Sequence, residues 1–306
     1  MKPYVFVLFG GRSNEREVSV VTGNAVTQAL IATGYKVKSI DVGENIESIL
    51  ANLDPKPDVV FNALHGRFGE DGYIQTILET LKVKYTHSGV LASYIAMDKE
   101  ISKKIFITNR INTPKFFTYS FDLKRSDLLK KIKKKLKFPV VIKPLNEGSS
   151  VNVYICSKKN IIRTLNSLKN YKKVMIEEFI GGREIQVAIM GNKKLGAIEL
   201  KPKRKFYDYQ AKYNSKAKTQ HIIPVDLTKN KLKEILDIAY KAHSIIGCKG
   251  VTRSDFKFFN GRFYLLEINT QPGMTKLSLV PEIAAYKGIK FIELIEWILK
   301  DASTNK

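Results

Sequence analysis

The first third of the chain alternates short apolar runs with longer amphipathic stretches, and this alternation limits the possible folds more than any other feature. Strand-length runs lie at 4–9, 36–41 and 59–63, while apolar residues recur at helical spacing over 17–33 and 72–81. Strands separated by helices of this length predict parallel pairing, because a parallel crossover needs a dozen or more residues. The sequence therefore predicts a doubly wound parallel sheet at the N-terminus.

The remaining two thirds lose this alternation and predict mixed α+β structure. Helices are expected at 91–108, 124–137, 161–168, 232–246 and 289–299. Strands are expected at 116–121, 138–144, 152–156, 174–179, 183–190, 194–200, 254–259 and 262–269. The predicted fold class is thus α/β, and α+β in parts, with three units at 1–86, 87–180 and 181–306.

The charge of the chain is strongly positive. Its 306 residues include 52 Lys and Arg against 29 Asp and Glu, a formal net charge of +23. Clustered Lys and Arg are typical of nucleic-acid-binding proteins, but here the excess is spread along the chain. The one dense run, at 124–137, carries Leu128, Ile132 and Leu136 at helical spacing, which places its lysines on a solvated face. No helix-turn-helix, zinc-finger or RNP-type motif accompanies the charge, so no nucleic-acid partner is expected.

Cysteine usage and hydropathy exclude further classes. Cys156 and Cys248 lie far apart and neither belongs to a CxxC pair, which argues against a zinc module and against a disulfide scaffold. No run approaches the ~18 consecutive apolar residues of a membrane span. The first apolar run is too short for a signal peptide and is followed by no cleavage site. A cytoplasmic protein without a membrane partner is the expectation.

The hairpin expected at 254–269 carries the clearest chemical signal. Asp255, Glu267 and Asn269 are oxygen donors, and Mg²⁺ prefers one or two carboxylates together with phosphate oxygens. A two-residue turn at Asn260-Gly261 pairs Asp255 with Leu266 and sends Asp255 and Glu267 to opposite faces, whereas a three-residue loop pairs Asp255 with Glu267 on one face. Spacing alone leaves a metal site and a hairpin with solvated acids both open.

Two lysines are candidates for binding an anion. Lys143 ends an apolar strand, where an ammonium group is costly unless it meets an anion such as phosphate. Lys99 begins a helix after Asp98 and gives a weaker signal of the same kind. For both, a surface lysine remains the alternative on local sequence.

A polar loop at 64–72 directly follows a buried strand. It places His65, Arg67, Glu70 and Asp71 among three glycines, and such residues pack poorly in a core. Ligands of doubly wound sheets bind at the carboxyl ends of the strands. A functional loop is therefore favoured, with Glu15 and the rest of the loop after the first strand close to it.

Six motifs occur in one order along nearly the whole chain: GGRSNEREVS at 10–19, HGRFGEDG at 65–72, MDK at 97–99, EGSSV at 147–151, YDYQAKY at 207–213 and EINTQPGMT at 267–275. Together they closely resemble the D-alanine–D-alanine ligases of the ATP-grasp superfamily. The resemblance implies an ATP-grasp fold, with an N-terminal substrate-binding domain at 1–86, a central subdomain at 87–180 and a catalytic subdomain at 181–306.

The resemblance also implies an activity. Members of this family join two D-alanines into D-alanyl-D-alanine, a peptidoglycan precursor for the cell wall, in the cytoplasm and usually as homodimers. They use ATP and two Mg²⁺ or Mn²⁺ ions. The carboxylate of the first D-alanine attacks the γ-phosphate of ATP to give an acyl phosphate, which the amine of the second D-alanine then attacks.

For the nucleotide, the resemblance assigns each role to positions that match a family motif. Phosphate contacts are implied for Lys99, Lys143 and Lys212. The adenine-binding hinge and the ribose contact are implied for Glu177, Glu178, Phe179, Ile180 and Glu184. The metal ligands are implied to be Asp255, Glu267 and Asn269.

For the amino acids, Glu15 is expected to bind the ammonium of the first D-alanine, within a network completed by Ser149 and Tyr213. His65 is expected near the carboxylate of that D-alanine. Arg253 and the N–H of Gly273 are expected to stabilise the oxyanion of the tetrahedral intermediate. The carboxylate of the second D-alanine is expected at Ser278 and Leu279.

The sequence departs from the family pattern at two positions. Asn152 stands where the family usually has glycine, and Gln210 replaces a more common glutamate. The motif at 207–213 is otherwise intact, and it is altered in relatives that make D-alanyl-D-lactate. The dipeptide is therefore the expected product, with D-alanine–D-lactate ligation or another ATP-grasp carboxylate–amine ligation as the alternative.

Overall fold

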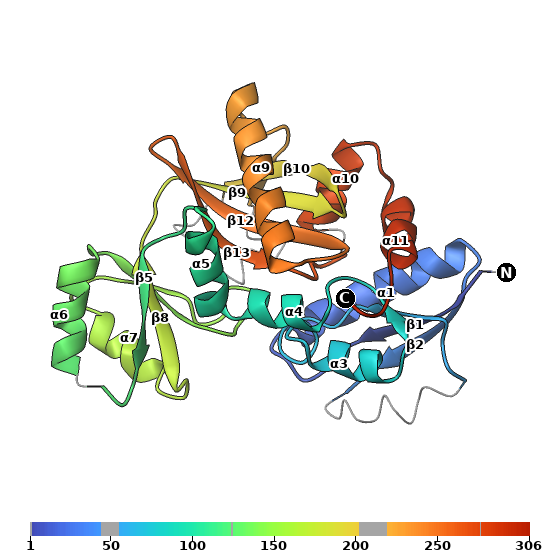
Figure 1. Cartoon of the computed structure of the whole chain (residues 1–306), viewed down its shortest axis with the longest axis horizontal. Coiled ribbons are helices and arrows are strands. Elements are labelled where there is room, and N and C mark those ends of the chain that lie inside the picture. Colours follow the sequence, from blue (N-terminus) through green and yellow to red (C-terminus); the bar gives the residue numbers. More distant parts are fainter. Residues whose placement is uncertain (1, 44–54, 124, 202–218, 276) are drawn as a thin grey trace.

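The computed structural model describes residues 2–43, 55–123, 125–201, 219–275 and 277–306. The predicted site residues Lys212 and Tyr213, and the substitution at Gln210, lie outside these ranges. Within them, the strands form three sheets built from successive stretches of the chain (Figure 1). No helix in this part of the chain is long and apolar enough to cross a membrane.

The first sheet is parallel and has the strand order β2-β1-β3-β4. Its strands are β1 (Tyr4–Phe9), β2 (Lys36–Asp41), β3 (Val59–Asn62) and β4 (Lys84–Tyr85), and its helices are α1 (Arg16–Ala32) and α3 (Tyr73–Thr80). Val5 and Val7 pack in the core that contains α1, while Phe6 and Leu8 pack in the core that contains α3. Burial on both faces explains the continuous apolar run of β1 and confirms the predicted doubly wound sheet.

The second sheet is antiparallel, with the order β5-β8-β6-β7. Its elements are β5 (Phe116–Ser120), α6 (Arg125–Lys135), β6 (Val140–Pro144), β7 (Tyr154–Cys156), α7 (Ile161–Ser167) and β8 (Lys173–Glu178). On α6, Leu128 and Ile132 are buried, as is Leu136 just beyond it, while Lys130 and Lys133 are exposed. The basic run therefore has the solvated face that its spacing predicts.

The third sheet is also antiparallel, in the order β11-β10-β9-β12-β13. Its strands are β9 (Arg183–Met190), β10 (Lys193–Lys201), β11 (Gln220–Ile222), β12 (Val251–Phe259) and β13 (Arg262–Asn269). Helix α9 (Lys229–Ile246) covers one face, and α10 (Leu279–Tyr286) and α11 (Phe291–Lys300) join the core on the other. The core that contains α10 and α11 also contains residues of α1. Helices α11 and α1 therefore lie side by side (Figure 1). The division into units 1–86, 87–180 and 181–306 stays a prediction.

One expected helix is two helices. Instead of a continuous segment at 91–108, α4 (Val90–Met97) ends before Asp98 and α5 (Lys99–Thr108) begins after it. Asp98 has extended backbone, and its Oδ1 accepts the N–H groups of Glu100 and Ile101 at 2.9 and 3.0 Å. This capping satisfies donors that a helix start leaves without partners. The break makes Lys99 the first residue of a new helix.

The hairpin of β12 and β13 combines both registers considered from the sequence. Its turn is the two-residue Asn260-Gly261, with φ values of 48° and 72°, and Phe259 pairs with Arg262. The pairing nevertheless places Asp255 opposite Glu267, because the register shifts between Asp255 and Phe256. A β-bulge of this kind adds one residue to one strand and turns the following side chains to the other face. The two acids therefore lie opposite each other despite the short turn.

Candidate functional site

Two pockets adjoin where the three sheets approach one another. Lys99, Glu147 and Glu267 line both pockets and form their common boundary. The first pocket brings together the described residues predicted to handle amino acids: Glu15, His65, Ser149, Arg253, Gly273, Ser278 and Leu279. The second brings together those predicted to hold the nucleotide: Lys143, Glu177, Glu178, Phe179, Ile180 and Glu184.

On one side of the first pocket, the loops after β1 and β6 meet. Glu15 is 8% exposed, and its carboxylate accepts a hydrogen bond from the hydroxyl of Ser149. A Cβ at Gly148 would overlap the Glu15 carboxylate, so a larger residue there would force this carboxylate to shift. The predicted contact between Glu15 and Ser149 is therefore present, whereas its third member, Tyr213, lies outside the described residues.

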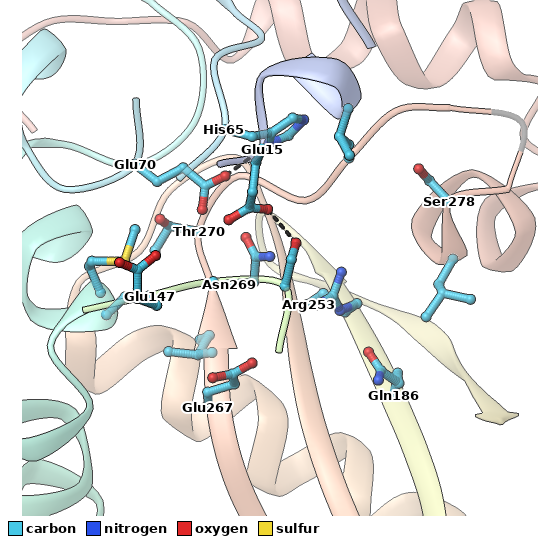
Figure 2. A pocket seen from close by; sticks show the side chains of 18 of the residues that line it. Glu15, His65, Glu70, Glu147, Gln186, Arg253, Glu267, Asn269, Thr270 and Ser278 are labelled. Carbon is cyan, nitrogen blue, oxygen red and sulfur yellow. Dashed lines mark hydrogen bonds and ion pairs between the residues drawn. The ribbon is translucent and has the colours of Figure 1, made fainter. Parts of the chain in front are cut away.

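His65 lies on the same side, held by a chain of buried polar groups (Figure 2). Its Nδ1 is 2.8 Å from Glu70 Oε1, and its Nε2 is 3.1 Å from Thr22 Oγ1. Its carbonyl accepts the Ser13 hydroxyl at 2.5 Å, which confirms that the loop after β1 lies against the 64–72 loop. Both ring nitrogens thus already have protein partners, so the ring is fixed in orientation.

The other side of the first pocket is lined by residues of β9, β12 and β13 and by the N-terminus of α10 (Figure 2). Gly273 lies so close to Ser278 that a Cβ there would be 3.1 Å from its Oγ. Ser278 is the residue before the first turn of α10, and Leu279 begins that turn. The first N–H groups of a helix lack helical acceptors, which suits a carboxylate at this position.

The second pocket is built around a buried carboxylate on β8. Glu177 is 3% exposed, and its two oxygens lie 2.6 Å from Lys143 Nζ and 2.8 Å from Lys103 Nζ. Burial alone raises the pKa of a carboxyl group, but the two ammonium groups outweigh burial and lower the pKa of Glu177. Next along the chain, Glu184 pairs with Lys257 at 2.9 Å.

The predicted metal ligands run along the boundary of the two pockets. Asp255 lines the second pocket, Asn269 the first, and Glu267 both. Each carboxylate attracts a cationic side chain: Arg253 lies 2.8 Å from Asp255, and Lys99 lies 3.3 Å from Glu267. Among the described residues, no cluster of three His, Cys, Asp or Glu side chains forms a ready-made metal site. Two carboxylates and an amide suit Mg²⁺, which keeps several waters and uses phosphate oxygens as further ligands.

Several residues of the site escape the sequence analysis. Glu147 lines both pockets, and its carbonyl accepts Lys99 Nζ at 2.6 Å. The sequence feature that could have indicated Glu147 is its position directly before Gly148, at the start of the motif at 147–151. Lys103 is fully buried beside Glu177. Its spacing of four residues from Lys99 places it on the same helix face, but this spacing does not indicate the contact with Glu177, which lies on another element.

The comparisons with known proteins agree with this geometry. Residues 108–300 match the family model "D-ala D-ala ligase C-terminus", and residues 46–88 match "D-ala D-ala ligase N-terminus". A D-alanine–D-alanine ligase of Pelagibacter ubique is 66% identical over 306 residues, covering the whole of both chains. One from Wolbachia pipientis is 45% identical and covers all of this chain and 96% of the relative.

Solved structures extend the match to three dimensions. The crystal structure of D-alanine–D-alanine ligase from Bacillus anthracis is 34% identical with a TM-score of 0.86, covering 97% of this chain and 96% of that one. The same enzyme complexed with ATP is 30% identical with a TM-score of 0.84, covering 98% and 97%. The expected ATP-grasp fold is thereby confirmed. On its sequence and on its fold, the chain belongs to the D-alanine–D-alanine ligase family.

Proposed function

We propose that the two adjoining pockets ligate two D-alanines into D-alanyl-D-alanine at the expense of ATP. Membership of the family supports this reaction, in which D-alanyl phosphate is the intermediate and the product supplies peptidoglycan synthesis. The observation that carries the proposal is the boundary formed by Lys99, Glu147 and Glu267, which belongs to both pockets. A γ-phosphate at this boundary meets the carboxylate of an amino acid held in the first pocket.

The first step needs a positioned carboxylate and a stabilised phosphoryl group. Glu15, buried and oriented by Ser149, binds the ammonium of the first D-alanine and so turns its carboxylate toward the boundary. Lys99 and Lys143 contact the phosphates, as does Lys212 from outside the described residues. Cationic groups on the developing charge are the main catalytic need of phosphoryl transfer. His65, held between Thr22 and Glu70, lies near the carboxylate of the first D-alanine.

The second step builds negative charge on the carbonyl oxygen of the acyl phosphate. Arg253 and the N–H of Gly273 line the first pocket and stabilise this oxyanion. Ser278 and Leu279, at the start of α10, bind the carboxylate of the second D-alanine and so present its amine. The phosphate leaves with the oxygen that the first D-alanine supplied, and the amine loses its proton to complete the peptide bond.

The adenine and ribose occupy the second pocket. Glu177, Glu178, Phe179 and Ile180 form the adenine-binding hinge, and Glu184 binds the ribose. Asp255, Glu267 and Asn269 would hold two Mg²⁺ or Mn²⁺ ions, which would neutralise the charge of the phosphates.

We further propose that the protein is a cytoplasmic homodimer without nucleic-acid or membrane partners. Light scattering tests the dimer, and cell fractionation tests the location.

The test is to incubate the purified protein with Mg²⁺, ATP and D-alanine, to follow phosphate release and to identify the product by mass. We expect D-alanine-dependent phosphate release and a D-alanyl-D-alanine product. The reaction should also proceed with Mn²⁺ in place of Mg²⁺, and EDTA should abolish it. Parallel reactions use L-alanine and an equimolar mixture of D-alanine and D-lactate. A product containing D-lactate in preference to the dipeptide would contradict the substrate assignment while leaving the ligase chemistry intact.

A further inference from the structure

Lys103 is a fully buried lysine for which the proposed reaction has no use. It lies on α5, four residues after Lys99, and its exposed fraction is 0%. Its Nζ donates a hydrogen bond to Thr113 Oγ1 at 2.7 Å and lies 2.8 Å from Glu177 Oε2. An ammonium group removed from water costs several kcal/mol unless it is paired, so a chain keeps one in its interior only where its charge is compensated.

The partner of Lys103 is shared with a second lysine. Glu177 places Oε1 at 2.6 Å from Lys143 Nζ and Oε2 beside Lys103, so that one carboxylate lies between two ammonium groups. All three side chains are less than 10% exposed. The carboxylate can neutralise only one of the two positive charges, and the cluster therefore keeps an excess of one.

Only one of these lysines reaches the nucleotide pocket. Lys143 and Glu177 line it, whereas Lys103 does not and lies behind Glu177. Without Lys103, Glu177 and Lys143 would form a neutral pair. The negative charge of Glu177 would then largely cancel the attraction of Lys143 for phosphate. With Lys103 present, Glu177 holds Lys143 in place while the three groups together keep one positive charge.

We propose that Lys103 is a positioning residue for ATP, which acts through Glu177 by balancing its charge and so leaves the charge of Lys143 for the phosphates. This inference rests on the proposed ATP site in the second pocket. Burial lowers the pKa of Lys103 to about 8, and the Glu177 carboxylate opposes this shift by favouring the charged ammonium group.

The test measures ATP binding by isothermal titration calorimetry in the presence of Mg²⁺, together with steady-state kinetics. Lys103→Met removes the charge at nearly constant volume. Lys103→Gln also removes it but keeps a donor for Thr113 and Glu177, so it remains informative if the Met variant folds poorly. Lys104→Met is the matched control, because it removes the same charge from the next residue of α5, whose side chain is 66% exposed.

We expect both Lys103 variants to bind ATP about 10-fold more weakly or worse, the loss typical of a charge-assisted contact. The KM for ATP should rise in parallel, while the KM for D-alanine and kcat at saturating ATP stay within about twofold. Lys104→Met should bind ATP like the wild type. In a Glu177→Gln background, Lys103→Met should change ATP affinity by less than about twofold, because no carboxylate is left to balance.

Three results would overturn the inference: wild-type ATP affinity in both Lys103 variants, the same loss in the Glu177→Gln background, or equal losses in the KM for D-alanine and in kcat. The last would mean that Lys103 is only structural. Failure of the wild-type protein to bind ATP at all would instead overturn the proposed nucleotide site, so the two failures are distinguishable.

Discussion

The Ser149 hydroxyl donates a hydrogen bond to the Glu15 carboxylate and so joins two loops that are 134 residues apart in the chain. The loop after β1 belongs to the parallel sheet, and the loop after β6 belongs to the second sheet. In the proposed reaction, placement of the first D-alanine therefore depends on how these two parts of the molecule meet. Gly148, directly before Ser149, lies against the same carboxylate, which a Cβ at this position would overlap.

Replacing Gly148 by alanine should specifically weaken D-alanine binding. The new methyl group would overlap the Glu15 carboxylate, which would have to leave its position beside the Ser149 hydroxyl. We expect the KM for D-alanine to rise about 10-fold or more, since a displaced charged contact costs about 1.5–3 kcal/mol. The affinity for ATP should stay within about twofold. Gly181→Ala is the control, because a Cβ at Gly181 comes no closer than 3.8 Å to its neighbours; equal effects of the two substitutions would contradict the account.

The departure at Asn152 has a backbone explanation. Asn152 has a φ of 56°, in the left-handed region that glycine adopts freely and that asparagine tolerates best among the other residues. Its side chain also donates to the Tyr171 hydroxyl at 2.9 Å. Both Asn152→Gly and Asn152→Ala lose this hydrogen bond, but only alanine adds strain. We expect the alanine variant to be less stable than the glycine variant by about 1 kcal/mol in urea unfolding, and equal stabilities would refute the explanation.

Divalent cations alone should bind weakly. Arg253 already pairs with Asp255, and Lys99 with Glu267, so a metal ion must displace these side chains unless the phosphates of ATP attract them instead. We expect millimolar Mg²⁺ alone to raise the melting temperature by less than about 1 °C, whereas Mg²⁺ with saturating ATP raises it by several degrees through mass action. A melting-temperature shift from Mg²⁺ alone as large as that from Mg²⁺ with ATP would show that the cations do not compete.

Two buried histidines should make the fold sensitive to acid. Burial lowers the pKa of His243 to about 4 and that of His87 to about 3, while in the unfolded chain both titrate near 6.5. Between pH 6.5 and 4 the unfolded chain therefore binds protons that the folded protein does not, and the free energy of unfolding falls as pH falls.

The His243→Asn variant removes one of these two titrating groups. Between pH 6.5 and 4, its free energy of unfolding should depend less steeply on pH than that of the wild type, by up to about 1.4 kcal/mol per pH unit. Urea unfolding of the variant and the wild type at pH 7.5, 6 and 5 measures the difference. Parallel pH dependences would mean that His243 takes up its proton in the folded state.

The elements that depend on local pattern were predictable. The apolar run at 4–9 forms β1, and Leu128, Ile132 and Leu136 face the core as their spacing requires. Helix α10 was missed, because Pro281 interrupts its apolar run; proline is tolerated there since the N–H groups of a first turn have no helical acceptor. The pairing of Asp255 with Glu267 was undecidable, since the bulge that creates it depends on packing between strands.

The site residues that stand in sequence motifs could be predicted. Those identified only by a contact between elements far apart in the chain were harder to predict. Glu15, Ser149 and Glu267 stand in motifs and line the pockets, whereas Asp255 was found from its place in the hairpin. The role of Lys103 depends on a contact with Glu177, which lies 74 positions later and on another element, so no local spacing reveals it. The roles of all these residues stay predictions, and Lys212 and Tyr213 also lie outside the described residues.

The most direct test of the proposed reaction traces a carboxylate oxygen of D-alanine into the released phosphate. The protein is incubated with Mg²⁺, ATP and D-alanine labelled with ¹⁸O in its carboxylate, and the released phosphate and the peptide are analysed by mass spectrometry. If the carboxylate of the first D-alanine attacks the γ-phosphate, each phosphate released with D-alanyl-D-alanine carries one ¹⁸O atom. Unlabelled phosphate, or phosphate released without the dipeptide, would contradict the proposed ligation through D-alanyl phosphate.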